Sequence, residues 1–353
     1  MLNPGEGLEN KPRQPEVIAE RCVHSRIPSA SCRACVDICP GGAWQLDEQQ
    51  LGIDTSLCDG CGICAGACPE QAIEHLHRPL TLRWRDRKVA MLACEKSVKQ
   101  PPGIDDGIVH CVHAFGIREL QQLHARGYRR LFVSTACCTE CSRGRPPLLD
   151  LYLERLNNLF RARGEDEIER VDISPMQWEN MLASTRPEHR GDQLSRRSLL
   201  RHTLHRIGRL GLGKFDRHEI PPVSEMPLSS LYGENPDAAV FLNVPEIDTS
   251  LCSACNACVR LCPHEALTLD REDMAYRIDP RACTACGICV DVCEDRAIRI
   301  LDVARVEQYA IALDESRCDA CGSPFYSLND VPEALCPVCR HKNHAARLYQ
   351  VID

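Results

Sequence analysis

The sequence has few aromatic residues, no excess of positive charge and no long hydrophobic run. Phe, Trp and Tyr make up 5% of the chain, and 42 basic residues against 50 acidic ones give a formal net charge of −8. Nucleic-acid-binding domains usually show a basic excess, so we expect no nucleic-acid partner. No apolar run approaches the roughly 18 to 20 residues that a transmembrane helix needs, so none is predicted.

Several other signatures are missing as well. The segment Met1–Glu20 is polar and lacks the apolar stretch of a secretory signal, so we expect no secretion signal. No G-x-G-x-x-G motif follows a predicted strand, and neither a catalytic triad nor a pair of catalytic carboxylates is evident. We therefore assign no nucleotide site, no catalytic residue and no substrate from the sequence.

Cysteine, in contrast, is abundant, with 25 among 353 residues. This density indicates either a disulfide framework or metal ligands. Because we expect no secretion, metal binding is the favoured interpretation. The chain is long enough for two or three domains and for at least one sizeable core.

Most of the cysteines fall into four blocks that repeat one spacing. Three blocks read C-x2-C-x2-C-x3-C, and the other has nine residues between its first two cysteines. The flanking sequence is repeated too, since Ile53–Leu57 and Ile247–Leu251 are identical. We interpret the blocks as an internal repeat arranged in two pairs. In chain order, the block cysteines are Cys22, Cys32, Cys35 and Cys39; Cys58, Cys61, Cys64 and Cys68; Cys252, Cys255, Cys258 and Cys262; and Cys283, Cys286, Cys289 and Cys293.

This spacing suits an iron–sulfur cube, which needs four thiolate ligands. Three closely spaced cysteines on a tight loop can hold three corners of a cube. Small residues between them, such as Gly60 and Ala254, let backbone amides approach the sulfurs. Zinc or a chance cluster of thiols is the alternative, but three copies of one spacing favour iron–sulfur.

The motifs resemble those of bacterial-type ferredoxins with two [4Fe–4S] clusters, over about Cys22–His77 and again over Val244–Leu301. In two-cluster ferredoxins the fourth cysteine of each motif ligates the other cluster of the pair. The resemblance therefore implies four [4Fe–4S] clusters. It assigns Cys58, Cys61, Cys64 and Cys39 to one cluster and Cys32, Cys35, Cys68 and Cys22 to its neighbour, then Cys252, Cys255, Cys258 and Cys293 to a third and Cys283, Cys286, Cys289 and Cys262 to the fourth. The long gap before Cys32 departs from the family pattern, so His24 or an open iron site is the alternative to Cys22.

Two further C-x2-C pairs near the C-terminus predict a metal site of another kind. Fourteen residues separate the pairs, and two such pairs are typical of a zinc ribbon. A rubredoxin-type iron site is the alternative. The expected ligands are Cys318, Cys321, Cys336 and Cys339; His341 and His344 lie beyond them, but four cysteines already complete a tetrahedral site.

Between the two ferredoxin-like modules the pattern changes to alternating strands and helices. We predict strands at 88–93, 131–134 and 168–173 and helices at 114–125 and 148–161, forming a small parallel sheet. Cysteines follow two of these strands and precede one helix. They could hold zinc or a further iron–sulfur centre, because ligands bind at the carboxyl ends of strands in open α/β sheets. Free thiols lining a pocket are the alternative. The five residues are Cys94, Cys111, Cys137, Cys138 and Cys141, and their arrangement loosely resembles the iron–sulfur delta-subunit domain of hydrogenase and heterodisulfide reductase systems.

These features predict a modular α+β protein. We expect a flexible tail at 1–14, a ferredoxin module at 15–78 and a small α/β cysteine-containing domain at 79–185. A linker at 186–240 is expected to contain a basic amphipathic helix around 199–210, which could pack on the protein, on an anionic membrane surface or on an acidic partner. The second ferredoxin module is expected at 241–303, and a zinc-ribbon-like module at 304–353.

The expected function is that of a multi-cluster electron carrier and not of an enzyme on its own. We expect it to relay single electrons between oxidoreductase subunits that act as donor and acceptor. Two alternatives remain: a redox enzyme subunit with a substrate site at the middle-domain cysteines, and a redox or assembly factor that docks through the zinc ribbon. Because such clusters are oxygen-sensitive, we expect a cytoplasmic protein, with peripheral membrane association at the inner face of a membrane complex as a further possibility.

Overall fold

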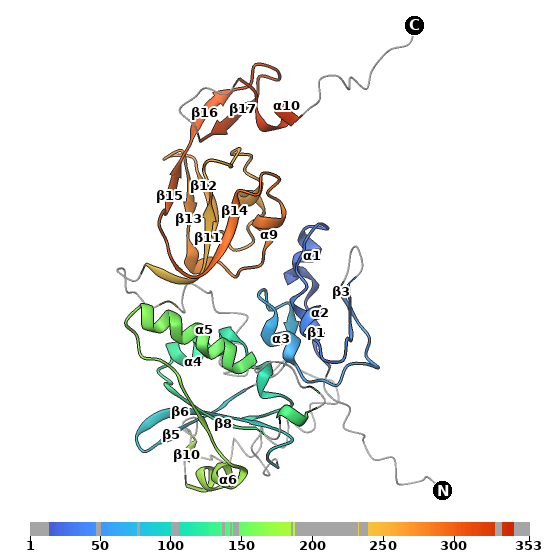
Figure 1. Ribbon diagram of the computed structural model, residues 1–353, viewed down its shortest axis with the longest axis vertical. Coiled ribbons are helices and arrows are strands. Elements are labelled where there is room, and N and C mark those ends of the chain that lie inside the picture. Colours follow the sequence, from blue (N-terminus) through green and yellow to red (C-terminus); the bar gives the residue numbers. More distant parts are fainter. Residues whose placement is uncertain are drawn as a thin grey trace, which may run out of the picture. The chain divides into compact units, whose positions relative to one another are not determined.

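The computed structural model describes residues 14–46, 51–75, 78–99, 106–135, 138–141, 143, 148–184, 186–187, 232, 239–328 and 334–341. The chain divides into two compact units (Figure 1). Unit 1 takes its residues from Met1–Ile18, Ala34–Asp47 and Leu51–Leu231, and unit 2 from Ala19–Arg33, Glu48–Gln50 and Tyr232–Asp353. Four predicted features lie outside the described residues: most of the N-terminal tail, the basic helix around 199–210, Cys137 and His344. Within the described ranges, every helix is too short or too polar to span a bilayer.

The first ferredoxin-like part of unit 1 consists of short elements around a small core. Helices α2 (Ala34–Ile38) and α3 (Ile63–Ala67) pack together, and the strands form two antiparallel pairs. One core cluster joins Trp44, Cys64 and Ile73. The pairs are β1 (Glu16–Val17) with β4 (Ile73–Glu74), and β2 (Trp44–Leu46) with β3 (Leu51–Ile53).

A six-stranded mixed sheet forms the rest of unit 1. The strand order is β10-β5-β6-β8-β9, with β7 also beside β6. Strands β6, β7, β8 and β9 are parallel to one another, whereas β5 pairs antiparallel with both β6 and β10. The bounds are β5 (Leu80–Trp84), β6 (Arg87–Cys94), β7 (Ile108–Val109), β8 (Arg130–Ser134), β9 (Glu169–Asp172) and β10 (Arg186–Pro187).

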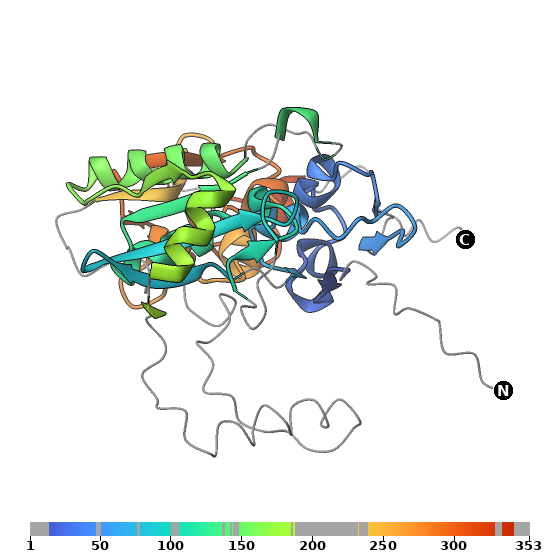
Figure 2. The ribbon, with the colours of Figure 1, turned by 90° about the horizontal axis from the view of Figure 1, so that it is seen from below.

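Helices cover both faces of this sheet (Figures 1 and 2). Val89 and Met91 of β6 pack with Trp178 of helix α6, so alternate residues of the strand point to the opposite face, where α4 and α5 lie. The helical elements are the 3-10 turns η2 (Val112–Ala114) and η3 (Cys138–Glu140), and the helices α4 (Ile117–Ala125), α5 (Leu148–Ala162) and α6 (Pro175–Ser184).

Two features of this sheet domain differ from the sequence-based expectation. The sheet is mixed and not purely parallel, because β5 and β6 form a hairpin whose turn residues Arg85 and Asp86 have φ of 49° and 62°. Such turns usually contain Asn-Gly or Asp-Gly, so the sequence carries no clear hairpin signal. The helix predicted at 114–125 is interrupted, because Gly116 separates η2 from α4 and its amide donates to Glu119 Oε2 at 3.1 Å.

The second ferredoxin-like part lies in unit 2. Strands β11 (Val240–Ile247) and β14 (Ile298–Arg305) pair antiparallel over seven register positions, and a second sheet has the order β12-β13-β15. Tyr276 is fully buried in the core cluster that joins these elements. The remaining bounds are β12 (Leu267–Asp270), β13 (Ala275–Ile278), β15 (Ala310–Ala312), α8 (Ala257–Leu261), η7 (Pro280–Ala282) and α9 (Ile288–Asp291).

Unit 2 also includes an N-terminal segment and a C-terminal hairpin. The segment Ala19–Arg33 carries η1 (Ala19–Arg21) and α1 (Val23–Arg26), and its residues Val23 and Ile27 pack with Ile288 of α9. The backbone amide and hydroxyl of Ser31 both donate to the Asp291 carboxylate, at 2.8 Å and 2.6 Å. The C-terminal elements are β16 (Asp314–Arg317), β17 (Pro324–Ser327) and α10 (Pro337–His341).

Candidate metal centres

Four of the predicted ligands in unit 1 line one small cavity. Cys58 and Cys61 come from the loop that leads into α3, Cys64 lies within α3, and Cys39 follows α2. Apolar side chains, including Trp44 and Leu57, complete the lining. The fourth cysteine of one motif therefore lies with the first three of the other, as the family resemblance implies for a cluster.

The thiols in this cavity are strongly influenced by burial. The pKa of Cys61 is raised to about 12, mainly by burial, and Asp59 contributes to the increase. Burial also raises the pKa of Cys64 to about 12, with the neighbouring thiols of Cys39 and Cys58 contributing. Iron or zinc binds the deprotonated thiolate, so a metal must displace these protons and compensate the negative charge that the cavity otherwise disfavours.

The cysteines predicted for the neighbouring cluster are divided between the units. Cys35 and Cys68 pack against the core cluster of unit 1 that contains Trp44. Cys22 and Cys32 belong to the segment Ala19–Arg33 of unit 2. The Nε2 atom of His24, the alternative to Cys22, donates to the carbonyl oxygen of Cys32 at 2.8 Å. Which residue completes this ligand set stays a prediction.

In unit 2, a second cavity is also lined by four predicted cluster ligands, three from one motif and one from its partner motif. Its lining includes Cys283, Cys286 and Cys289 from the second motif and Cys262 from the end of the first. Burial raises the pKa of Cys289 far above its ordinary value, and the nearby thiols of Cys283 and Cys286 contribute to the increase. The crossed arrangement of fourth and first three cysteines thus recurs in the second pair of motifs.

The remaining four predicted ligands of unit 2 are also close to one another. The pKa of Cys258 is raised to about 12, mainly by burial, and the nearby thiols of Cys252, Cys255 and Cys293 contribute to the increase. Tyr276 supports this loop, because its hydroxyl donates to Asn256 Oδ1 at 2.7 Å. Cys293, the fourth cysteine of the second motif, therefore lies beside the first three cysteines of the first.

A shared backbone geometry explains why these loops can surround a cluster. Each of the three regular loops has two residues with positive φ between its cysteines: Gly60 and Gly62, Ala254 and Asn256, and Ala285 and Gly287. Such turns point successive backbone amides towards one concave side, which favours a bound anionic group. Glycine is thus preferred but not required at these positions, so the motif tolerates alanine or asparagine there.

Backbone amides also bond directly to the fourth cysteine of three motifs. The amides of Ala43, Ala72 and Ala297 donate to the sulfurs of the cysteines four residues earlier, at 3.4, 3.3 and 3.2 Å. Hydrogen bonds to sulfur stabilise the negative charge and tune the potential of an iron–sulfur site. Sequence reasoning did not identify these donors, although the recurring alanine four residues after the last cysteine was the available signal.

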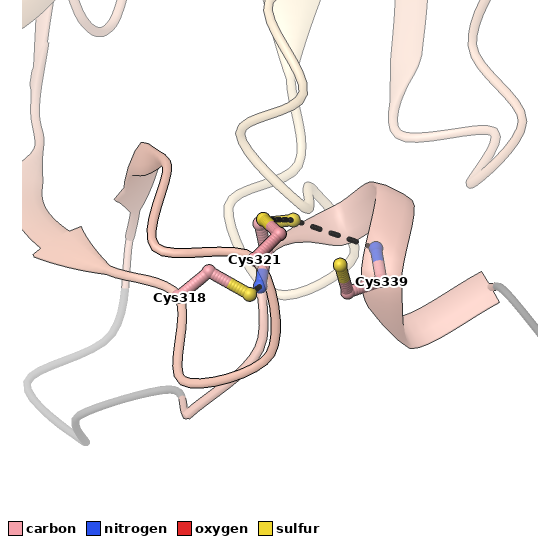
Figure 3. A group of neighbouring side chains, drawn as sticks. Cys318, Cys321 and Cys339 are labelled. Carbon is pink, nitrogen blue, oxygen red and sulfur yellow. Dashed lines mark hydrogen bonds between the residues drawn. The ribbon is translucent and has the colours of Figure 1, made fainter. Parts of the chain in front are cut away.

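The C-terminal cysteines form a compact site (Figure 3). The sulfurs of Cys318, Cys321, Cys336 and Cys339 all lie within 4.8 Å of one another. The Cys321 and Cys336 sulfurs are 3.9 Å apart, close to the roughly 3.8 Å expected when four thiolates surround one zinc ion at about 2.3 Å. The backbone amide of Cys336 donates to Cys318 Sγ at 3.3 Å, and this bond lowers the pKa of the Cys318 thiol. A four-cysteine site that could hold one metal ion is therefore present.

The four described cysteines of the sheet domain are brought to one edge of the sheet. Cys94 ends β6, Cys111 precedes η2, and Cys138 and Cys141 follow β8. The pKa of Cys111 is raised to about 11, mainly by burial, and the neighbouring thiols of Cys94 and Cys138 contribute to the increase. Burial likewise raises the pKa of Cys138, and the thiols of Cys94 and Cys141 contribute to the increase. Cys138 is thus a neighbour of Cys94, Cys111 and Cys141, and Cys94 is also a neighbour of Cys111.

Comparison with known families agrees with the two sets of ferredoxin-like motifs. A 4Fe-4S binding domain matches residues 51–74, and a 4Fe-4S dicluster domain matches residues 251–297. Both matches contain regular C-x2-C-x2-C-x3-C motifs. The match in unit 2 includes both motifs of the pair in which the fourth cysteine of each motif lies with the first three of the other.

Similar proteins include ferredoxins and subunits of oxidoreductases. Ferredoxin 7Fe of Hydrogenibacillus schlegelii is 37% identical over 59 residues, which are 17% of this chain and 69% of that protein. The pyruvate synthase subunit PorD of Methanocaldococcus jannaschii is 37% identical over 79 residues, 21% of this chain and 84% of PorD. The thiosulfate reductase electron transfer subunit PhsB of Salmonella typhi is 36% identical over 63 residues, 16% of this chain and 33% of PhsB. With two such modules, and with most of two of these small proteins covered, the chain belongs to the 4Fe–4S ferredoxin family.

Proposed function

We propose that this protein holds four [4Fe–4S] clusters and relays single electrons between the donor and acceptor subunits of an oxidoreductase. The crossed placement of cysteines in both units is the observation that carries the proposal. Cys39 lies with the first three cysteines of the following motif, and Cys262 lies with those of the last motif. Similarity to named electron-transfer and oxidoreductase subunits supports the same role.

The crossing also determines how close the two clusters of a pair would be. Cys258 lies in α8 and Cys262 caps its end, yet the two residues belong to different ligand sets. At about 1.5 Å of rise per residue, four residues of helix separate their backbones by roughly 6 Å along the axis. When bound, a cluster accepts and releases one electron without a proton or a substrate bond being made. The short helix therefore keeps the two sites of a pair adjacent, as a relay needs.

Two further assignments complete the proposal. The C-terminal four-cysteine site is proposed to hold one zinc ion, because its sulfurs lie within the distance that one tetrahedral ion requires. Its role would be to stabilise the hairpin of β16 and β17, which offers few buried apolar residues of its own. Placement in the cytoplasm beside a membrane complex remains a prediction.

The test is the cluster content of full-length protein purified and reconstituted without oxygen. Four cubes require about sixteen irons and as many labile sulfides per chain. Electron paramagnetic resonance of the reduced protein should show magnetically interacting pairs. Eight or fewer irons after full reconstitution would contradict the proposal. Isolation of the protein from its native cell under anaerobic conditions should recover it with an oxidoreductase subunit, which would identify the partner.

A further inference from the structure

The four neighbouring cysteines of the sheet domain lie at the edge where the parallel strands end. Cys94 closes β6, and Cys138 and Cys141 follow β8, its parallel neighbour. Cys111 follows β7, which pairs with β6 on its other side. Carboxyl ends of adjacent parallel strands converge at one edge, so thiols from three strands meet there although up to 47 positions separate them in the sequence.

Positive charge is placed beside these thiols. The ammonium group of Lys96 donates to Cys141 Sγ at 3.5 Å. The side chain of Arg143 is only 11% exposed, and it donates to the backbone carbonyl of His110 at 2.7 Å, next to Cys111. It also pairs with the carboxylates of Asp59 and Glu95. Such cations would balance part of the negative charge that the four sulfurs carry when they bind a metal as thiolates.

This thiol group adjoins the first ferredoxin-like motif. Cys111 belongs to the same buried apolar cluster as Cys61, Ile63 and Leu148. Asp59, the partner of Arg143, accepts the backbone amide of Cys61 at 3.1 Å. One predicted ligand of a ferredoxin cluster and one thiol of the sheet-domain group are therefore packed into the same core.

We propose that Cys94, Cys111, Cys138 and Cys141 hold a redox-active iron–sulfur centre that exchanges electrons with the ferredoxin cluster at Cys39, Cys58, Cys61 and Cys64. The inference rests on the proposed relay function and extends it. In each exchange, one ferrous iron in one centre becomes ferric while one ferric iron in the other becomes ferrous, and no bond or proton is transferred. Because electron tunnelling falls exponentially with distance, the core that Cys61 and Cys111 share gives a short route between the two sites.

Iron content of the full-length, anaerobically reconstituted protein tests the centre itself. An iron–sulfur centre with four cysteine ligands adds about two or four irons to the roughly sixteen of the ferredoxin sites. Cys111→Ser should lose only this addition, whereas Cys137→Ser is the matched control and should keep it. A full set of about sixteen irons with no addition, or with one zinc in its place, would overturn this inference and leave the ferredoxin relay intact. Loss of the sixteen irons themselves would instead contradict the proposed function.

Magnetic coupling and thiol protection complete the test. In the reduced protein, spin coupling between the new centre and its neighbour should broaden the paramagnetic resonance signal, and Cys111→Ser should remove that broadening. Unchanged signals would overturn the proposed exchange. Alkylation of the folded wild-type protein should leave the four proposed ligands protected, and this measurement requires no variant. Protection of Cys137 with modification of Cys138 would refute the proposed ligand set.

Discussion

The contact between the ferredoxin-like part and the sheet domain of unit 1 depends on two glycines, and replacing them gives a sharp prediction. A Cβ atom on Gly66 of α3 would lie 2.2 Å from the carbonyl oxygen of Ala114, and one on Gly116 would lie 2.4 Å from that of Gly66. Real Cβ atoms essentially never approach closer than 3.0 Å, so Gly66→Ala must push α3 and η2 apart by about 0.8 Å. Both obstructing atoms belong to the backbone and cannot rotate away.

The expected loss of stability follows from this overlap. Inserting a methyl group into a packed contact costs about 1–3 kcal/mol. Alanine gains about 0.5–1 kcal/mol over glycine inside a helix, which offsets part of the cost for Gly66→Ala in α3. With about 2–4 °C of thermal midpoint for each kcal/mol in a unit of this size, we expect the midpoint to fall by several degrees. Gly116 has φ of −89°, so Gly116→Ala is not strained in its backbone, and its midpoint should fall for the same steric reason.

The matched control is Gly52→Ala in β3, where the new Cβ atom would lie 3.8 Å from its nearest neighbour, the carbonyl oxygen of Gln45. Anaerobic scanning calorimetry at one scan rate, on proteins of equal iron content, should show no decrease for this control. If the thermal midpoints of Gly66→Ala and Gly116→Ala were equal to that of the control, α3 and η2 would not pack as the structure shows.

Three other predictions concern separate sites. Cys262→Ala should remove about four irons from the cluster of the last motif, measured by iron analysis and resonance spectra, and loss of the cluster of its own loop would contradict the crossed ligation. Burial lowers the pKa of His124, so the unfolded chain binds a proton more readily and stability should decrease as pH falls below about 6.5. His124→Gln should make the thermal midpoint fall less between pH 7 and pH 5. An equal fall in the wild-type protein and the variant would refute this prediction. A zinc chelator should release about one zinc ion and expose the C-terminal hairpin to proteases while iron content stays constant, and release of iron instead would refute the zinc assignment.

The cluster sites could be predicted from sequence because their ligand spacing is local. Three thiols within seven positions must lie on one loop, whatever the rest of the chain does. The same holds for each C-x2-C pair of the C-terminal site, although its second pair comes fourteen residues later. Crossed ligation was implied by family resemblance, and the structure places Cys39 and Cys262 accordingly. Whether each predicted ligand binds iron stays to be measured.

The sheet domain could be predicted only in part. Hydrophobic runs predicted β6, β8 and β9, and cysteines were predicted to lie together because they follow two of these strands and precede a helix. The β5–β6 hairpin was missed because Arg85 and Asp86 adopt a left-handed turn that their residue types do not signal. The interruption at Gly116 was missed for another reason, since its position is determined by the backbone of α3 and not by neighbouring residues in the sequence.

The packing of Gly66 against Gly116 also links stability to electron exchange in unit 1. The close approach lets Cys61 and Cys111 share one core, so the two thiol sites are adjacent only because neither glycine carries a side chain. Gly66→Ala should therefore weaken the magnetic coupling and lower the thermal midpoint together, while keeping all the iron. Cys111→Ser should abolish the same coupling by removing one centre, with the glycine contact unchanged. If Gly66→Ala lowered the thermal midpoint but kept the full magnetic coupling, the exchange would follow another path through the unit.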